Sequence, residues 1–435
     1  MSALAKWFVA QGKQVSGSDL VLSSITQELS DHGIKIFEGQ SEDHVKDDID
    51  LLIYSSAVPE ENSERQRARV LKIPEMTYTQ ALGEMSKHYQ TLVVSGTHGK
   101  STTTAMLGLI LEAADLDPTV IVGSRVPSFT EKNLRVGQGN YFVVEGCEYK
   151  ANMLSLHPSL IVLTNIEEDH LDYYRDLDHI RETFQTFVDQ AGEGTVVWNA
   201  DDSESQKLTI PHGVSYGFGD EAIYQVKNRQ MEHGVQKAEV WKGEQKLGEL
   251  TLCIPGRHNV YNALAATVAA MEVGVSFDIC AKTLADFHGI WRRFEILGTW
   301  KGAEVISDYG HHPTEINATL QAAREFYPGR RIVLCFQPHQ HARTLALKDE
   351  LAQAIAGADV VIVPEIYEVA GRTEGESISS KDLVSLAQKI FSEKTFVYAQ
   401  DFAEARRLLE ERIQPGDVLI IQGAGDIDDL ARSLV

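Results

Sequence analysis

The first ninety residues alternate between helical and strand-like patterns of apolar positions. Residues 2–10 place Leu4, Trp7 and Phe8 on one side of a helix that ends before Gly12. The patterns that follow predict a strand at 14–18, a helix at 24–32, and strands at 35–38 and 49–55. Such alternation is typical of an α/β fold with a parallel sheet.

This first region begins with a helix, whereas an α/β unit of this kind normally begins with a strand and a glycine-rich turn. We therefore expect that the first strand and its turn are missing from this chain, through truncation or a misplaced start. The N-terminal domain is predicted to be Rossmann-like and incomplete at its beginning.

Two further regions repeat the α/β alternation. The second has strands at 91–94, 141–145 and 160–164, helices at 100–113, 179–190 and 259–273, and a section at 213–255 that suggests antiparallel strands. The third has strands at 304–307, 331–336, 358–364 and 417–421, with helices at 313–326 and 347–356. The predicted fold is α/β in three domains: residues 1–88, a central ATP-binding domain at 89–290, and a Rossmann-like domain at 291–435.

Composition narrows the class of protein. The formal net charge is −23, which argues against a nucleic-acid-binding surface because such surfaces neutralise phosphates with Lys and Arg. The four cysteines are scattered without metal-ligand spacing, as in a cytosolic protein with reduced thiols. No run of residues has the length of a membrane span or the form of a signal peptide. We expect a cytoplasmic protein whose partners are small molecules; its oligomeric state cannot be deduced.

A glycine-containing segment between a predicted strand and a predicted helix has the layout of a phosphate loop. Its glycines let backbone N–H groups face an anion, Lys100 can reach the terminal phosphates, and Ser101 can ligate Mg²⁺. Counted from Gly96, the segment is one residue shorter than the general phosphate-loop motif GxxxxGK(S/T). The alternative to a phosphate loop is a tight glycine turn followed by a surface lysine. The predicted ATP-binding segment comprises Gly96, Thr97, His98, Gly99, Lys100, Ser101 and Thr102.

Two polar residues follow neighbouring predicted strands. Glu145 ends the strand at 141–145, and His170 lies in the acidic stretch after the strand at 160–164. Both strand ends should lie at the same edge of the sheet as the phosphate loop. A carboxylate there is suited to Mg²⁺, whereas His170 by itself could be an ordinary surface or capping residue.

Three more clusters are candidates for function. The helix start at 256–262 carries amides suited to a purine edge, or simply an N-terminal cap. Arg292 and Arg293 form a basic pair, or a surface salt-bridge pair. The run from Ser307 to Glu315 ends a strand and begins a helix, and so many polar residues after a buried strand favour a functional loop.

Taken together, these motifs resemble the Mur ligase family of peptidoglycan synthesis. The resemblance covers essentially the whole chain, and its motifs occur in the family's order: VSGSD (15–19), SSA (55–57), GTHGKSTTT (96–104), TNIEEDH (164–170), GRHNVYNALAA (256–266), RRF (292–294), DYGHHPTEI (308–316) and FQPH (336–339).

The resemblance implies an ATP-dependent amide ligase that joins L-alanine to UDP-N-acetylmuramate through an acyl phosphate, with ATP and Mg²⁺ as cofactors. It implies catalytic roles for Lys100, His170 and Arg343, and metal-site roles for Ser101, Glu145 and His170. Beyond the phosphate loop, the implied ATP contacts are His258, Asn259, Asn262, Arg293 and Asp308. The implied substrate contacts are Asp19, Ser55, Ser56, Asn165, Tyr309, His311, His339 and Arg343.

The chain departs from the family pattern in three places. The glycine-rich turn expected before Met1, which would bind the UDP diphosphate, is absent. Gln340 stands where the alanine ligases usually have an arginine, so a fixed cation expected near the substrate carboxylates is missing and the resemblance does not define the amino-acid specificity. The stretch at 145–149 is less acidic than expected, although Glu145 is retained.

Other functions remain open at this stage. A ligase that couples a whole murein tripeptide shares the scaffold. A nucleotide-binding regulatory module without ligase activity is a second alternative, and a dinucleotide-dependent oxidoreductase is a third, weakened by the missing first turn.

Overall fold

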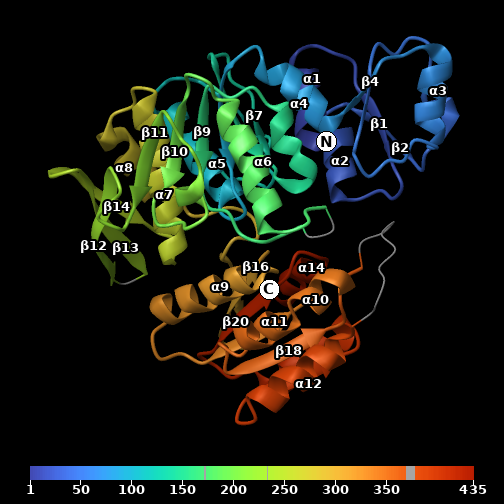
Figure 1. Ribbon diagram of the computed structural model, residues 1–435. Coiled ribbons are helices and arrows are strands. Elements are labelled where there is room, and N and C mark those ends of the chain that lie inside the picture. Colours follow the sequence, from blue (N-terminus) through green and yellow to red (C-terminus); the bar gives the residue numbers. More distant parts are fainter. Residues whose placement is uncertain (171–172, 233, 369–377) are drawn as a thin grey trace. The chain divides into compact units, whose positions relative to one another are not determined.

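The computed structural model describes residues 1–170, 173–232, 234–368 and 378–435. They divide into two compact units, Met1–Gln225 with Leu264–Cys280, and Val226–Ala263 with Ala281–Val435 (Figure 1). Strand β12 (Tyr224–Glu232) and helices α7 (Arg257–Glu272) and α8 (Phe277–Ala285) each contribute residues to both units. The two units are described separately below.

The N-terminal part of the first unit contains two small parallel sheets. β1 (Ser16–Asp19) pairs with β2 (Lys35–Glu38), and β3 (Leu52–Tyr54) pairs with β4 (Glu75–Thr77). Within the described ranges these pairs are separate sheets rather than one continuous sheet. The helices of this part are α1 (Ser2–Ala10), α2 (Ser24–Asp31), α3 (Ser63–Leu71) and α4 (Tyr78–Ser86), with the short 3-10 turn η1 (Glu42–His44). The predicted helix at 2–10 is confirmed, whereas the third strand is shorter than predicted.

The rest of the first unit is built on a larger, mainly parallel sheet. Its strands lie in the order β11-β10-β9-β5-β8-β6-β7, in which only the β6–β7 pair is antiparallel. Leu92, Val93 and Val94 of β5 are fully buried, as expected for a central strand covered on both faces. The elements are β5 (Gln90–Ser95), α5 (Lys100–Ala113), β6 (Thr119–Ile121), β7 (Leu134–Arg135), β8 (Tyr141–Gly146), η2 (Tyr149–Ser155), β9 (Leu160–Leu163), α6 (Leu177–Asp189), β10 (Thr195–Asn199), η3 (Ser205–Lys207) and β11 (Gly213–Gly217).

The expectation of antiparallel strands throughout residues 213–255 is wrong in its first part. β11 runs parallel to β10, and β12 begins parallel to β11. β13 (Val235–Lys242) and β14 (Gln245–Leu252) form an antiparallel pair, as expected. The segment through η3 carries the chain back to the start of the next strand, and such a crossover makes the neighbours parallel.

The C-terminal part of the second unit is a six-stranded sheet in the order β15-β16-β20-β17-β18-β19. Only β15 runs antiparallel to its neighbour. The elements are β15 (Glu295–Trp300), β16 (Ala303–Asp308), α9 (Pro313–Phe326), β17 (Ile332–Phe336), α10 (His341–Ala346), α11 (Lys348–Ile355), β18 (Val360–Pro364), α12 (Ser380–Ile390), β19 (Thr395–Ala399), α13 (Phe402–Arg412), β20 (Val418–Gln422) and α14 (Ile427–Leu434).

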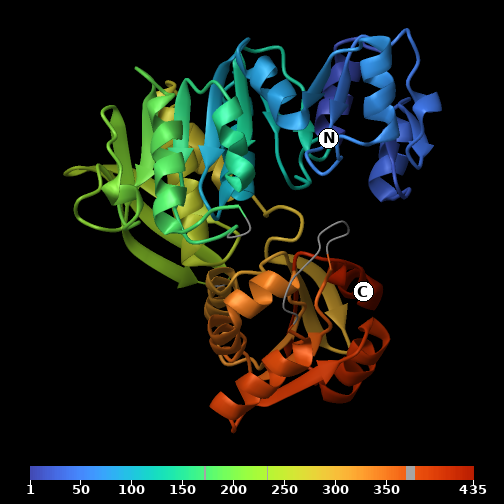
Figure 2. The same cartoon turned by 45° about the vertical axis from the view of Figure 1, so that its right-hand side comes forward.

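Helices cover both faces of this sheet (Figure 2). Successive residues of a strand point to opposite faces, so Ile306 joins a core with α9, α11 and α12, while Val305 joins a core with α13 and α14. The same division separates Leu334 from Cys335 and Ile420 from Ile421. This two-sided burial explains why the strands are nearly continuous apolar runs.

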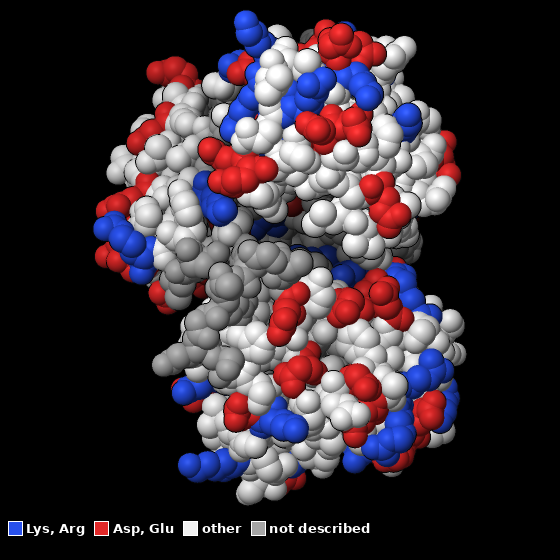
Figure 3. All heavy atoms as spheres, turned by 90° about the vertical axis from the view of Figure 1, so that its right-hand side faces the viewer, with Lys and Arg blue, Asp and Glu red and all other residues white. Residues whose placement is uncertain are grey.

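Acidic and basic side chains are interspersed on the visible face of each unit, without a broad basic area (Figure 3). Among the helices of the described segments, we find none with the length and hydropathy needed to cross a membrane.

Candidate active site

The predicted phosphate loop has the expected strand–loop–helix structure. β5 ends at Ser95 and α5 begins at Lys100, with two glycines in conformations of positive φ between them. Gly96 has φ +133° and Gly99 has φ +85°. These conformations turn the backbone sharply ahead of the helix N-terminus, the kind of position at which proteins commonly bind anions.

Gly96 is required by close packing as well as by its φ angle. A Cβ atom at this position would lie 2.1 Å from the Thr164 hydroxyl oxygen and 2.8 Å from the Asn165 carbonyl oxygen. The loop therefore packs directly against the segment that follows β9.

We expect Gly96→Ala to distort the loop and weaken ADP binding strongly, because the unfavourable φ alone costs about 1–3 kcal/mol before the clash is added. Gly192→Ala is the matched control, since Gly192 has φ +57° and an added Cβ would meet nothing within 4 Å. Calorimetric titration with ADP measures the affinity of each variant, and we expect a loss of affinity in Gly96→Ala alone. Equal affinities in both variants would show that the close packing at Gly96 is unimportant.

The Lys100 side chain lies over its own loop and against a buried carboxylate. Its Nζ donates hydrogen bonds to the carbonyl oxygens of Gly96 (2.7 Å) and Thr97 (2.9 Å). It also lies 2.8 Å from Glu148 Oε2. Burial alone would lower the pKa of Lys100, but Glu148 outweighs it and raises the pKa above the ordinary lysine value. Lys100 is thus a fixed cation over the predicted phosphate loop.

Two carboxylates lie at the end of β8, and they have different partners. Glu145 Oε2 accepts a hydrogen bond from Ser101 Oγ at 3.1 Å, and its other oxygen accepts one from the Gly123 N–H. Glu148 lies 3.3 Å from His170 Nε2 as well as beside Lys100. The predicted metal residues Ser101 and Glu145 are therefore together, whereas His170 contacts Glu148.

Glu148 is the main residue that sequence reasoning missed here. Burial alone would raise the pKa of its carboxyl group, but Lys100 and His170 beside it hold that pKa below the usual range. Glu148 is therefore an anion although only 5% of its surface is exposed. The sequence could have indicated Glu148 as a site residue, because it lies three residues after Glu145 and just beyond a buried strand.

Neighbouring strands bring these groups to one edge of the sheet. β5 pairs in parallel with β8 on one side and with β9 on the other, so the phosphate loop, the two carboxylates and the His170 loop follow adjacent strand ends. His170 itself has φ +55°, a left-handed conformation that among residues other than glycine is adopted mostly by Asn, Asp and His.

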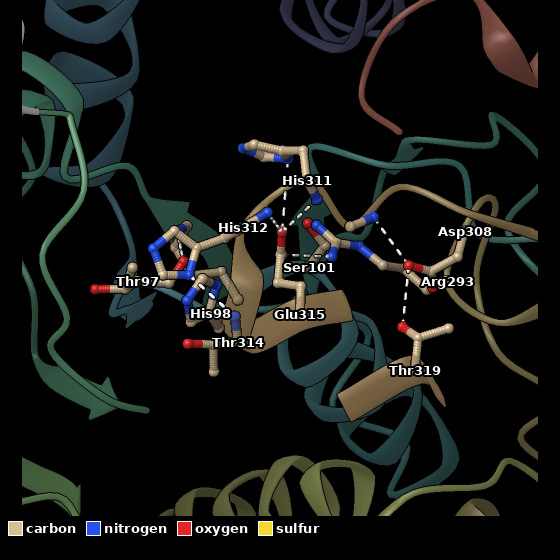
Figure 4. A network of polar contacts seen from close by, with 12 residues as sticks. Thr97, His98, Ser101, Arg293, Asp308, His311, His312, Thr314, Glu315 and Thr319 are labelled. Atoms are coloured by element: carbon tan, nitrogen blue, oxygen red, sulfur yellow. Dashed lines mark hydrogen bonds and ion pairs between the residues drawn. The ribbon is translucent and has the colours of Figure 1, made fainter. Parts of the chain in front are cut away.

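Two of the predicted ATP contacts of the second unit, Arg293 and Asp308, belong to a polar network at α9 (Figure 4). Arg293 donates to Glu315 Oε1 at 3.1 Å, and the other oxygen of Glu315 accepts the backbone N–H groups of His311 and His312. Pro313 occupies the first turn of α9 and His312 caps it. Glu315, which the motif analysis did not single out, thus links Arg293 to the polar loop.

Asp308 is buried and its carboxylate binds groups of its own domain. It accepts hydrogen bonds from the backbone N–H groups of Phe294 (2.9 Å) and Gly310 (2.8 Å) and from the side chains of Thr319 and Gln422. These bonds fix the backbone beside Arg293. Direct contact between Asp308 and ATP stays a prediction.

The start of α7 carries the residues predicted to contact adenine. Asn259 Nδ2 donates to the Pro255 carbonyl at 2.7 Å, and Asn262 Nδ2 donates to Asn259 Oδ1 at 3.1 Å. Both asparagines are nearly buried. Their side-chain amides make hydrogen bonds within the start of the helix. His258 precedes Asn259 directly in the sequence. A role for these three residues in binding adenine stays a prediction.

A row of four rings lies at the carboxyl end of the C-terminal sheet. Tyr309 contacts His311 edge-on, His311 lies beside His339, and His339 stacks on Tyr367 with ring centroids 5.5 Å apart. Arg343 lies 3.4 Å from His339. The structure thus brings together the four predicted substrate residues of this unit and adds Tyr367, which the sequence analysis missed.

Gln340 follows His339 in a strained conformation, with φ +68° and ψ +132°. Its N–H donates to the Tyr367 carbonyl at 3.0 Å, and the Tyr367 N–H donates to the Pro338 carbonyl at 2.9 Å. These two bonds hold the strained turn in place beside the ring row.

We expect Gln340→Gly to raise the free energy of unfolding by about 1 kcal/mol, because relief of backbone strain exceeds the entropy cost of a glycine. Gln138→Gly, at an exposed position that does not have positive φ, should be neutral or destabilising. Chemical denaturation measures both. Destabilisation by Gln340→Gly would mean that the side chain stabilises the turn more than the strain disfavours it.

Three further predicted substrate residues lie in the N-terminal part of the first unit, whereas Asn165 follows β9. Asp19 ends β1 and is exposed, and Ser55 and Ser56 follow β3 directly. Since β1 and β3 belong to separate sheets, no strand pairing within the described part of the chain joins these residues. Their role in UDP binding stays a prediction.

Comparison with known proteins gives family matches along the chain. Family models match in order over residues 1–90 ("Mur ligase family, catalytic domain"), 94–270 ("Mur ligase middle domain") and 292–425 ("Mur ligase, glutamate ligase domain").

Individual relatives match over nearly their full length. The UDP-N-acetylmuramate–L-alanine ligase of Alkaliphilus metalliredigens is 37% identical over 441 residues, which cover 100% of this chain and 94% of that protein. The enzyme of the same name from Acetivibrio thermocellus is 39% identical, with 98% and 91% covered.

Solved structures agree with these matches. The crystal structure of UDP-N-acetylmuramate-alanine ligase from Thermotoga maritima superimposes with a TM-score of 0.85 at 30% identity, covering 100% of this chain and 95% of that one. A murein peptide ligase from Psychrobacter arcticus superimposes with a TM-score of 0.73 at 24% identity over 100% and 95% of the two chains, which supports the fold alone.

Proposed function

Because the chain belongs to the Mur ligase family, we propose that it joins L-alanine to UDP-N-acetylmuramate at the expense of ATP. The observation that carries this proposal is the Lys100 ammonium, fixed over a glycine loop at a helix N-terminus and beside carboxylates on the neighbouring strand end. Full-length similarity to L-alanine ligases supports the choice of substrates.

The proposed reaction has two steps. The lactyl carboxylate of UDP-N-acetylmuramate attacks the γ-phosphorus of ATP, forming an acyl phosphate and releasing ADP. The amine of L-alanine then attacks the acyl carbon, loses a proton and expels inorganic phosphate as the amide forms. Both transition states gather negative charge on oxygen, which fixed cations and N–H donors stabilise without a protein nucleophile.

The residues at the end of β8 fit a magnesium site. Ser101, Glu145 and Glu148 offer oxygen atoms, the donors that Mg²⁺ prefers, and His170 lies beside Glu148. When bound, Mg²⁺ would neutralise charge on the phosphate oxygens. The four cysteines are all free, which suits the cytoplasmic location that we also propose.

The competing function is ligation of a whole murein tripeptide. The test measures phosphate release with UDP-N-acetylmuramate and ATP, comparing free L-alanine with the tripeptide at equal concentration. We expect L-alanine to support turnover and the tripeptide to give little. The reverse preference would reassign the chain to the recycling reaction.

A further inference from the structure

The segment that follows β9 is bonded to the phosphate loop at several points. The Thr97 N–H donates to the Asn165 carbonyl, and the Glu167 N–H donates to Thr97 Oγ1, both at 2.9 Å. Thr164 Oγ1 donates to the His98 carbonyl at 2.7 Å. The loop is therefore held by its neighbouring strand end as well as by its own glycines.

Within this segment, the Asn165 side chain binds both backbone groups of one loop residue. Its Oδ1 accepts the His98 N–H at 2.9 Å, and its Nδ2 donates to the His98 carbonyl at 3.1 Å. This is the pairing that a neighbouring strand would make, supplied by one amide. It uses the acceptor and one donor of Asn165 on the protein itself.

These bonds fix which way the loop's peptide groups point. In a trans peptide the carbonyl and the following N–H point in opposite directions. With the His98 carbonyl held by Asn165 and Thr164, the Gly99 N–H must point away from them. Anion-binding loops turn backbone N–H groups toward the anion, and Asn165, by holding the His98 carbonyl, fixes the direction of the Gly99 N–H.

The next strand along the sheet holds the Asn165 segment in turn. Asn199 Nδ2, at the end of β10, donates to the Thr164 carbonyl at 3.0 Å. Asp202 Oδ2 accepts the Ile166 N–H at 3.2 Å and is itself bonded to Ser205. Three adjacent strand ends, of β10, β9 and β5, thus stabilise one another.

We propose that Asn165 is a positioning residue for the phosphate loop rather than a contact of the muramoyl or amino-acid substrate. The inference deepens the proposed function and rests on it for the identity of the nucleotide. It predicts that Asn165 acts on ATP and ADP through His98, with no direct effect on UDP-N-acetylmuramate.

The test is ADP binding by calorimetry in Asn165→Asp and Asn165→Ala. The aspartate retains the acceptor but loses the donor and places an oxygen against the His98 carbonyl, while the alanine loses both bonds. We expect ADP affinity to fall about tenfold in each variant, from the loss of one or two hydrogen bonds. Asn133→Asp is the control, because Asn133 is a half-buried asparagine that donates to Ser2 Oγ away from the loop.

Steady-state kinetics separates positioning from substrate contact. We expect the KM for ATP to rise in Asn165→Asp while the KM for UDP-N-acetylmuramate stays within twofold of wild type. Unchanged ADP affinity in the folded aspartate variant, or a rise confined to the KM for UDP-N-acetylmuramate, would overturn the proposal. A wild-type chain that binds ADP but makes no amide would contradict the proposed function. The ADP affinities of the Asn165 variants would still test the positioning role of Asn165.

Discussion

Lys100→Ala should abolish turnover while the chain remains folded. The variant removes the only Lys or Arg side chain of the described loop at residues 96–102, and with it the charge that we propose faces the transferred phosphoryl group. Loss of a single fixed donor to a transition-state oxyanion typically lowers kcat by about 10²–10³, and we expect a loss at the upper end of that range or beyond. Phosphate release under single-turnover conditions measures the effect.

The matched control is Lys87→Ala, which removes an exposed lysine of the same unit that pairs with Glu84 on the surface. It should retain wild-type turnover, because exposed ion pairs contribute little. Thermal unfolding of both variants checks the fold. Lys100→Ala activity within tenfold of wild type would contradict the role assigned to the loop.

The second large effect is expected for Glu148→Gln, an isosteric change that removes one negative charge. Glu148 lies between Lys100 and His170, so its loss leaves Lys100 without its nearest counter-charge. Metal-free ADP should therefore bind at least as well as to wild type. Turnover should nevertheless fall by about 10²–10³, because the carboxylate proposed to hold Mg²⁺ is gone.

Activity and ADP affinity as functions of Mg²⁺ concentration decide this prediction. In Glu148→Gln, added Mg²⁺ should no longer improve nucleotide binding as it does in wild type. Glu145→Gln provides the comparison, since Glu145 contacts Ser101 instead of His170. An unchanged Mg²⁺ dependence in Glu148→Gln, with kcat within threefold, would show that Glu148 serves only as the counter-charge of Lys100.

The sequence predicted the elements around the site well, for identifiable reasons. The helices at 100–113 and 313–326 were predicted with the bounds observed. The first follows a glycine turn, and the second begins with a proline in its first turn, so both starts are marked by local chemistry. Buried strands such as β5 and β17 were found because covered parallel strands are continuous apolar runs.

Side-chain partners could not be predicted in the same way. The pattern of apolar residues placed Glu145 at the end of a strand. It could not show that Glu148, three residues later, contacts Lys100 and His170. Likewise, no local pattern indicated that the Asn165 amide would bind the backbone of His98. Such pairings depend on distances across neighbouring strands, which no local pattern encodes.

The most direct test of the central claim is the substrate dependence of ATP cleavage. ADP release is measured with the full chain, ATP, Mg²⁺, UDP-N-acetylmuramate and L-alanine, and then with UDP-N-acetylmuramate or L-alanine omitted. We predict that sustained ADP release requires both of these substrates, and that mass spectrometry finds a product equal to their summed mass less one water. ADP release that does not depend on either substrate, with no such product, would contradict the assignment as an amide ligase.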